Sequence, residues 1–295
     1  MMSHSDALGP IVVTGATGPV GRAVVAGLLH AGRPVRAVSR RPGRADMPPR
    51  AEVVAGDLAE PATLESAFAG AAQLVLIAWP DTVDGVIGRA RGAGVEHIVV
   101  VSSAAVTAGY DTSYNLPVEQ AVTASGLDWT LVRPGEFATN ASLLWGPSIR
   151  SHRRVVEPFP EQSGSPIHEA DVADVVVADL LDSRRRGRID TLVGPDTLTK
   201  REQVAAIAAA IGESVELAEV TAEEARTFYR AQGGFAADNA DFLFGFENYD
   251  GVAGAADEPR DGLADPYLTL AEVTGSPARS FAQWASEHAS DFTTR

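Results

Sequence analysis

The sequence predicts an α/β protein that has a doubly wound parallel β-sheet and a smaller mixed α/β lobe toward its C-terminus. Between Ile11 and Arg133, short apolar segments rich in valine alternate with segments of helical periodicity, which is typical of a parallel sheet. The chain has 295 residues, of which 45% are hydrophobic, enough for one large domain and a smaller lobe. We place the sheet domain at residues 1–150, rejoined by parts of 166–195, and the lobe at 151–295.

The first predicted strand leads into a glycine-rich loop. Residues 11–21 read I-V-V-T-G-A-T-G-P-V-G, and Ile11–Val13 is an apolar β-branched run typical of a buried strand. Pro19 begins the following helix, since its fixed φ suits a first helical turn. A turn built from glycines leaves the backbone bare, and the helix presents free N–H groups to an anion, so we expect a pyrophosphate here. The residues predicted to contact it are Gly15, Thr17, Gly18, Pro19, Val20 and Gly21.

The second predicted strand ends in residues that indicate which dinucleotide is bound. Val35–Val38 is followed by Ser39, Arg40 and Arg41, at the distance from the glycines where this kind of fold contacts the adenosine ribose. An acidic residue at this point would hold the 2′-hydroxyl of NAD. A hydroxyl followed by two guanidinium groups suits a 2′-phosphate instead, so the sequence favours NADP as the cofactor. The alternative is a solvated basic turn.

Four further strands are expected at residues 52–55, 73–78, 97–101 and 128–133, with helices at 61–68 and 117–125 between them. Ligands of such sheets lie beyond the carboxyl ends of the strands, so residues far apart in the sequence should line one crevice. Asp57 would either meet the adenine ring or close a loop, and the pattern fits both roles. The further predicted cofactor contacts are Asp57, Leu58, Ala78, Trp79, Ser102, Pro134 and Phe137.

Composition and charge exclude several classes of function. The net charge of −15 repels nucleic acid phosphates, so a nucleic-acid partner is not expected. The absence of cysteine removes disulfides, thiolate nucleophiles and cysteine metal sites, and no histidine–carboxylate pattern predicts a metal. The N-terminus lacks the basic and apolar parts of a signal peptide, and no apolar run approaches the roughly 20 residues of a membrane span. We therefore expect a cytoplasmic protein that does not associate with a membrane.

The segment A-S-G-L-D-W-T-L-V-R-P-G-E-F-A-T-N, Ala124–Asn140, resembles the NmrA-like branch of the atypical short-chain dehydrogenase/reductase superfamily. The opening T-G-A-T-G-P-V-G and the stretch P-I-H-E-A-D-V-A-D-V-V-V-A-D-L, Pro166–Leu180, fit the same branch. The resemblance implies a Rossmann-type NAD(P)-binding domain and a C-terminal lobe that binds substrate. The most aromatic stretch, Phe242–Tyr249, would either wall an apolar substrate pocket or form an ordinary helix core.

Most short-chain dehydrogenases use a Tyr-x-x-x-Lys pair, and this chain lacks it. Tyr114 stands near the expected place, but Val118 occupies the lysine position and the sole lysine is Lys200. Another group must therefore supply the proton if a carbonyl is reduced. The candidate donors are Tyr114, Tyr110 and Ser103. For chemistry that is not redox, the candidates for an acid or base are Glu136, His152 and His168.

Taken together, these patterns favour an NADP(H)-dependent oxidoreductase that reduces a small apolar carbonyl, quinone or enone. Quinones and enones suit a site without Tyr-x-x-x-Lys, because the anion formed is delocalised and needs less help from an acid. Two alternatives remain: a non-catalytic NADP redox sensor that acts through a protein partner, and a dehydratase or cyclase on the same scaffold. The sequence leaves the identity of the substrate and the oligomeric state open.

Overall fold

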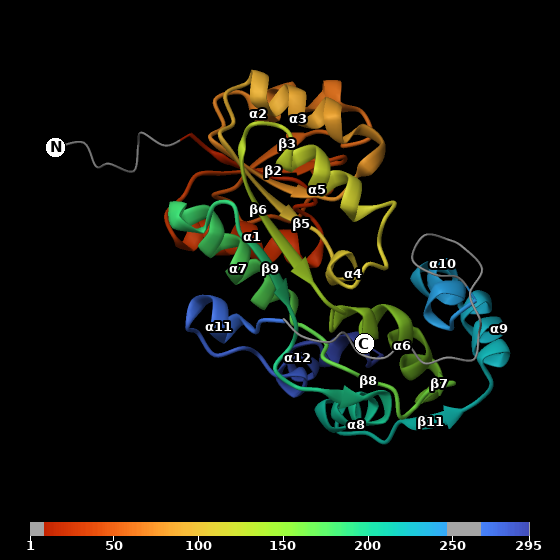
Figure 1. Ribbon diagram of the computed structural model, residues 1–295. Coiled ribbons are helices and arrows are strands. Elements are labelled where there is room, and N and C mark those ends of the chain that lie inside the picture. Colours follow the sequence, from red (N-terminus) through yellow and green to blue (C-terminus); the bar gives the residue numbers. More distant parts are fainter. Residues whose placement is uncertain (1–8, 247–266, 295) are drawn as a thin grey trace. The chain divides into compact units, whose positions relative to one another are not determined.

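The structure is a computed structural model that describes residues 9–246 and 267–294 (Figure 1). The described chain forms two compact units. The first unit contains the residues up to Pro134 together with Glu169–Leu192 and Leu270–Ser276. The second contains Gly135–His168, the described part of Val193–Thr269, and the residues from Pro277 onward. Each unit has a hydrophobic core of its own.

The first unit is organised around a sheet of seven strands. These are β1 Ile11–Val13, β2 Val35–Ser39, β3 Glu52–Ala55, β4 Gln73–Ile77, β5 His97–Val101, β6 Asp128–Pro134 and β9 Ile189–Leu192. Their order is β3-β2-β1-β4-β5-β6-β9, and every pairing is parallel. The order reverses between β1 and β4, so the predicted doubly wound parallel sheet is confirmed. Each strand expected from the sequence agrees to within one residue at either end.

Helices cover both faces of this sheet (Figure 1). They are α1 Pro19–His30, α2 Glu65–Phe68, α3 Val83–Gly92, α4 Ala104–Thr107, α5 Asn115–Thr123, α7 Glu169–Leu181 and α11 Leu270–Thr274. Helices α1 and α7 pack against each other on one face, whereas α2, α3 and α5 lie on the other. The predicted helix at 61–68 begins as a 3-10 turn over Pro61–Leu64. The one predicted at 117–125 is α5, which begins two residues earlier because the Asp111 carboxylate accepts a hydrogen bond from the Asn115 N–H.

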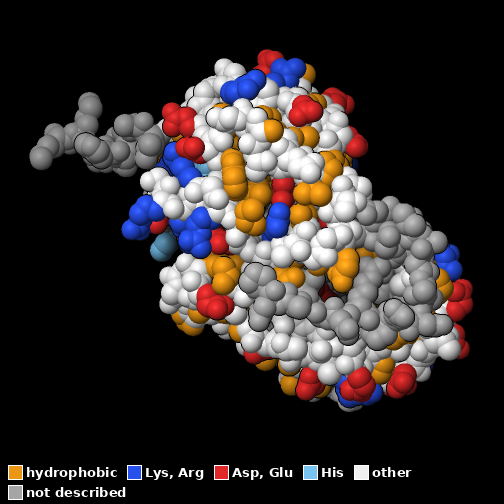
Figure 2. Space-filling model, viewed as in Figure 1, with side chains coloured by type: hydrophobic (Ala, Val, Ile, Leu, Met, Phe, Trp, Pro, Cys, Tyr) orange, Lys and Arg blue, Asp and Glu red, His pale blue; other side chains and the backbone are white. Residues whose placement is uncertain are grey.

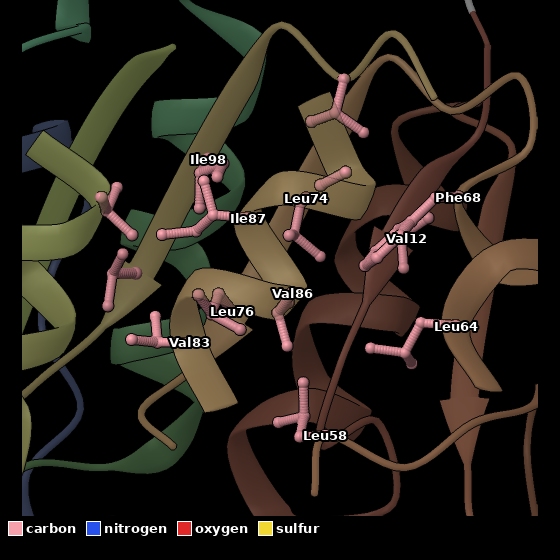
Figure 3. Packing of buried hydrophobic residues seen from close by; sticks show 14 of the residues in the cluster. Val12, Leu58, Leu64, Phe68, Leu74, Leu76, Val83, Val86, Ile87 and Ile98 are labelled. Atoms are coloured by element: carbon pink, nitrogen blue, oxygen red, sulfur yellow. The ribbon is translucent and has the colours of Figure 1, made fainter. Parts of the chain in front are cut away.

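One hydrophobic core of the first unit lies between the sheet and helices α2, α3 and α5 (Figure 3), and buried side chains of α1 and α7 pack on the other face. Val12, Leu74 and Ile98 extend from strands β1, β4 and β5, and all three are fully buried. Phe68 of α2 and Ile87 of α3 pack against them from the helical layer. Burial of such side chains is the main source of stability in a sheet of this kind, and it holds the strand ends in fixed positions.

The second unit is a mixed α/β structure, as predicted. Its elements are α6 Thr139–His152, β7 Arg154–Glu157, β8 Ser163–Gly164, β10 Leu198–Thr199, α8 Lys200–Ile211, β11 Glu216–Glu219, α9 Ala222–Gln232, α10 Gly234–Leu243 and α12 Phe281–Glu287. Strand β11 pairs with β7 in parallel, whereas β10 pairs with β8 in the antiparallel direction. None of the helices in the described ranges combines the length and the apolar character needed to cross a bilayer.

The aromatic stretch predicted at 242–249 contributes to the core of this second unit. The Phe244 ring is buried and stacks on the Tyr229 ring, with 5.4 Å between their centroids. Phe244 is therefore part of a helix core and not of a pocket wall. The last three residues of the stretch, 247–249, lie outside the described residues.

Candidate cofactor site

Two of the three glycines in the loop after β1 and the first turn of α1 are required by the packing of this segment. Gly15 has a φ of +60°, which side chains disfavour, and a Cβ on it would lie 2.9 Å from the Ile77 side chain. A Cβ on Gly21 would lie 2.2 Å from the Gly15 carbonyl oxygen. Gly18 differs, because its φ is −79° and the one described atom within 4 Å of its Cβ would be that same oxygen, at 3.3 Å. Its backbone conformation therefore does not require glycine at position 18, whereas the close approach of a phosphate to the backbone would.

The amino end of α1 is open to an anion. Gly18 is the N-cap, no side chain in the described chain caps the helix, and Pro19 occupies its first turn as predicted. Thr17 and Pro19 are exposed, and Gly18 and Val20 are partly exposed, so this end of the helix faces solvent. Free N–H groups and the positive end of the helix dipole attract phosphate. The predicted pyrophosphate contacts thus surround one exposed helix terminus.

The carboxyl end of β2 carries the residues predicted to meet a 2′-phosphate. The buried Ser39 hydroxyl accepts a hydrogen bond from the Arg41 N–H over 3.1 Å, which tightens the turn after the strand. Arg40 and Arg41 are exposed, in a connection that continues through a 3-10 helix at Pro42–Arg44. Strand β2 pairs with β1, so Arg40 and Arg41 follow the strand beside the one that leads into the glycine loop.

The other predicted contacts follow the remaining strands, with one exception. Asp57 closes the loop after β3, since its carboxylate accepts a hydrogen bond of 3.0 Å from the Ala59 N–H. Leu58 packs in the core of the first unit, whereas Trp79 is 36% exposed. Ala78, Ser102 and Pro134 stand at the ends of β4, β5 and β6. Phe137 is the exception, because it belongs to the second unit.

A buried polar network lies at the carboxyl ends of β5 and β6. The Ser102 hydroxyl donates to the Glu119 carboxylate over 2.5 Å, and Glu119 is 3% exposed. Arg133 donates to the same carboxylate with two nitrogens, over 2.9 and 2.5 Å. A third nitrogen of Arg133 donates to the Thr107 hydroxyl, which shares a hydrogen bond of 2.8 Å with the Thr191 hydroxyl. Residues from α4, α5, β5, β6 and β9 are therefore joined in one chain of hydrogen bonds.

Sequence reasoning missed Glu119 and Arg133, although both carry a signal. Arg133 is a charged residue in an otherwise apolar strand that is followed by proline, and a charge in such a place needs a partner. Glu119 comes one residue after Val118, the position where most short-chain dehydrogenases place lysine. The pairing of the two depends on contact between α5 and β6, which the sequence does not show.

Known proteins named for NAD(P)H are similar to this chain. Residues 15–183 match the family model described as NAD(P)H-binding. The (4-alkanoyl-5-oxo-2,5-dihydrofuran-3-yl)methyl phosphate reductase of Streptomyces griseus is 36% identical over 290 residues, covering 96% of this chain and 99% of its own. The NAD(P)H azoreductase of Xenophilus azovorans is 32% identical over 296 residues, with coverage of 96% and 99%. An NADPH-dependent quinone oxidoreductase from Escherichia coli shares the fold, with a TM-score of 0.74, 24% identity and coverage of 94% and 98%.

The chain belongs to the NAD(P)H-binding family. This membership agrees with the NAD(P)-binding domain that the resemblance to the NmrA-like branch implied. The protein is an NAD(P)H-dependent oxidoreductase with a Rossmann-type sheet, as the sequence predicted.

In this NAD(P)H-binding protein, Tyr114 lies at the carboxyl end of the sheet. Its hydroxyl donates to the Ala78 carbonyl oxygen over 3.2 Å, and its side chain is 44% exposed. The Asp111 carboxylate accepts a hydrogen bond from the Tyr114 N–H over 3.0 Å, which fixes the backbone from which the ring extends. Tyr110 is 50% exposed, whereas the Ser103 hydroxyl accepts a hydrogen bond from the Ala105 N–H and caps α4. Figure 2 shows hydrophobic side chains gathered over α5 and the neighbouring strand ends of this unit.

The candidate acids and bases of the second unit are occupied by other contacts. The Lys200 ammonium donates to the Glu136 carboxylate over 2.7 Å, so the only lysine of the chain forms an ion pair with a predicted catalytic residue. His152 is exposed and shares a hydrogen bond with the adjacent Ser151. His168 is buried beside the Glu287 carboxylate, at 3.2 Å. These contacts favour structural roles for both histidines.

Proposed function

We propose that the protein is an NADPH-dependent reductase of a small apolar acceptor, namely a carbonyl compound, a quinone or an activated alkene. The observation that carries this proposal is the uncapped amino end of α1 at Gly18, beside strand β2, which ends at Ser39 and is followed by Arg40 and Arg41. The named relatives support an activated alkene or a quinone as the acceptor. The Streptomyces griseus enzyme is named for a 5-oxo-2,5-dihydrofuran whose ring alkene is conjugated with a carbonyl and which also carries a methyl phosphate group, and the Escherichia coli enzyme is named for a quinone.

The residues present suit NADPH better than NADH. The pyrophosphate would bind the amino end of α1, where Gly18 leaves the backbone accessible. The 2′-phosphate would bind the guanidinium groups of Arg40 and Arg41, which are exposed and permanently charged. The nicotinamide would lie over the ends of β4 and β5, on the other side of the reversal in strand order.

Reduction of the acceptor needs a hydride and a proton. NADPH, when bound, would supply the hydride to the attacked carbon of the acceptor, so the remaining requirement is a proton. Tyr114 would give the proton to the resulting oxyanion or enolate, because its hydroxyl lies at the end of β4 and is partly exposed. Its present acceptor, the Ala78 carbonyl, orients the hydroxyl at this end of the sheet.

The test is oxidation of NADPH, followed by absorbance, with a panel of ketones, quinones and enones. We expect turnover with an enone or a quinone, and the Tyr114→Phe variant should lower kcat for an enone at least about tenfold. Tyr110→Phe tests the other candidate tyrosine, which is 50% exposed, and it should leave kcat unchanged if Tyr114 is the proton donor. Equal losses in the two variants would remove Tyr114 from the mechanism.

The same assay separates the alternatives. Stable binding of NADPH and NADP⁺ with equal affinity and no turnover would favour a dehydratase or cyclase on this scaffold. Strong preference for one redox form, together with capture of a protein partner and no turnover, would favour a sensor. Absence of binding to any nicotinamide dinucleotide at millimolar concentration would reject the proposed site altogether.

A further inference from the structure

Arg22 connects the two loops that the proposed cofactor would touch. It lies in α1, one residue after the last glycine of the loop, and its side chain is 46% exposed. Its Nε donates to the Thr17 carbonyl oxygen in the glycine loop over 3.0 Å. Its Nη1 donates to the Asp46 carbonyl oxygen over 2.7 Å, and Asp46 belongs to the connection between β2 and β3. One guanidinium group therefore bridges backbone atoms of two separate loops.

Within the described chain, the hydrogen bond from Arg22 is the one that joins the connection between β2 and β3 to a distant segment. The other hydrogen bonds of this connection are local turns, such as those from the Arg44 N–H to the Arg41 carbonyl and from the Ala45 N–H to the Pro42 carbonyl. The carboxylate of Asp46 lies 3.7 Å from Arg22 but is 97% exposed, so this ion pair contributes little. The bridge thus depends on the backbone carbonyl of Asp46 rather than on its side chain.

We propose that Arg22 is a positioning residue that makes the site selective for NADP over NAD. This inference rests on the proposed function, because it requires that Arg40 and Arg41 meet a 2′-phosphate. The pyrophosphate and the 2′-phosphate belong to one molecule, so the glycine loop and the β2–β3 connection must keep a set separation. Arg22 holds that separation before the cofactor arrives, which removes the entropy loss of ordering the connection on binding. NAD has no 2′-phosphate, and its affinity does not depend on this ordering.

The chemistry of the bridge requires arginine. A guanidinium group is planar and presents several N–H donors in fixed directions, so Nε and Nη1 can reach two carbonyls at once. A lysine at this position keeps the positive charge but ends in one compact ammonium group. Substitution by lysine therefore separates the bridging role from a general attraction between a cation and phosphate.

The test compares the dissociation constants of NADP⁺ and NAD⁺, measured by calorimetry, in the full-length protein and its variants. Arg22→Gln should weaken NADP⁺ about tenfold and NAD⁺ less than about twofold, and Arg22→Lys should resemble Arg22→Gln. Asp46→Ala is the matched control and should bind both cofactors as the wild type does. Amide hydrogen exchange across residues 41–46 of the unliganded Arg22→Gln protein should be faster, with a melting temperature close to that of the wild type.

Two results would overturn the inference while the proposed function stands. These are wild-type selectivity in Arg22→Lys, and an unchanged ratio of the two dissociation constants in Arg22→Gln. A failure of the proposed 2′-phosphate site looks different. In that case the wild type itself shows no preference for NADP⁺, and neither Arg40→Ala nor Arg41→Ala alters the ratio.

Discussion

The two sides of the carboxyl edge of the sheet in the first unit satisfy their polar groups in different ways. On the β1–β2 side, the amino end of α1 is uncapped by any described side chain, and Arg40 and Arg41 point into solvent. On the β5–β6 side, Ser102, Glu119 and Arg133 are hydrogen-bonded to one another and largely buried. One side therefore presents an uncapped helix terminus and exposed cations, whereas the other holds a largely buried ion pair whose charges neutralise each other.

This difference fits the proposed function. Exposed backbone and cations suit the proposed binding of phosphate groups. Neutralised side chains suit the proposed hydride transfer, in which positioning matters and a free charge would attract water. The partly exposed Tyr114 lies at the β4 end between these two sides, consistent with its proposed role as proton donor.

The largest expected effect concerns the β5–β6 side. Glu119→Ala leaves the Arg133 guanidinium without its carboxylate at a site where the Arg133 side chain is 15% exposed. We expect the free energy of unfolding, measured with urea, to fall by about 3–5 kcal/mol, because an unpaired buried charge is costly. Glu65→Ala is the control, since it breaks the exposed Glu65–Arg89 pair and should cost less than about 1 kcal/mol. Equal losses in the two variants would show that the network is not buried as described.

On the β1–β2 side, Gly18 and Gly21 should have different roles: Gly18 leaves room for the proposed ligand, and Gly21 leaves room for packing within the protein. Gly18→Val should weaken both NADP⁺ and NAD⁺ by at least about 100-fold, because its side chain fills the space proposed for the pyrophosphate. Its melting temperature should fall less than that of Gly21→Ala, since a Cβ on Gly18 would lie 3.3 Å from the Gly15 oxygen, a close contact that a small shift relieves. Gly21→Ala should do the reverse and lower stability, because its Cβ would lie 2.2 Å from that oxygen. Native affinity in Gly18→Val, measured by calorimetry, would contradict the assignment of this loop.

At the opposite edge of the sheet, where the parallel strands begin, His97 is the first residue of β5. The pKa of His97 is lowered to about 4, mainly by burial and also by the nearby Arg186, while Asp128 opposes the shift. In the unfolded chain the histidine titrates near 6.5, so it takes up a proton before the folded protein does. Stability should therefore fall by about 2 kcal/mol between pH 7 and pH 5 on account of this residue. The free energy of unfolding of the wild type, measured with urea, should show this pH dependence, and that of His97→Gln should not. The same pH dependence in both proteins would contradict the prediction.

The smallest effect concerns cofactor choice. Replacing both Arg40 and Arg41 by alanine should weaken NADP⁺ about tenfold and leave NAD⁺ within about twofold, because only NADP⁺ carries the 2′-phosphate. Arg50→Ala offers a control, since Arg50 is an exposed arginine of the same connection. If a cofactor titration finds both affinities unchanged in the double variant, Arg40 and Arg41 do not bind a 2′-phosphate.

The sequence by itself determined the features that depend on local pattern. The glycine loop, the strands to within one residue, Ser39-Arg40-Arg41 and the missing Tyr-x-x-x-Lys pair could all be read from neighbouring residues. Periodicity and turn chemistry act over a few residues, so they leave a direct record in the chain. The family resemblance was also sufficient to predict an NAD(P)H-dependent oxidoreductase.

Only the tertiary structure decided which distant side chains meet. The Glu119–Arg133 pair, the contact of Tyr114 with the Ala78 carbonyl and the Lys200–Glu136 pair join residues that no local pattern relates. The same holds for Arg22, whose two acceptors lie on different loops. Such contacts follow from the order of strands in the sheet and from packing in the core, which depend on the whole chain at once.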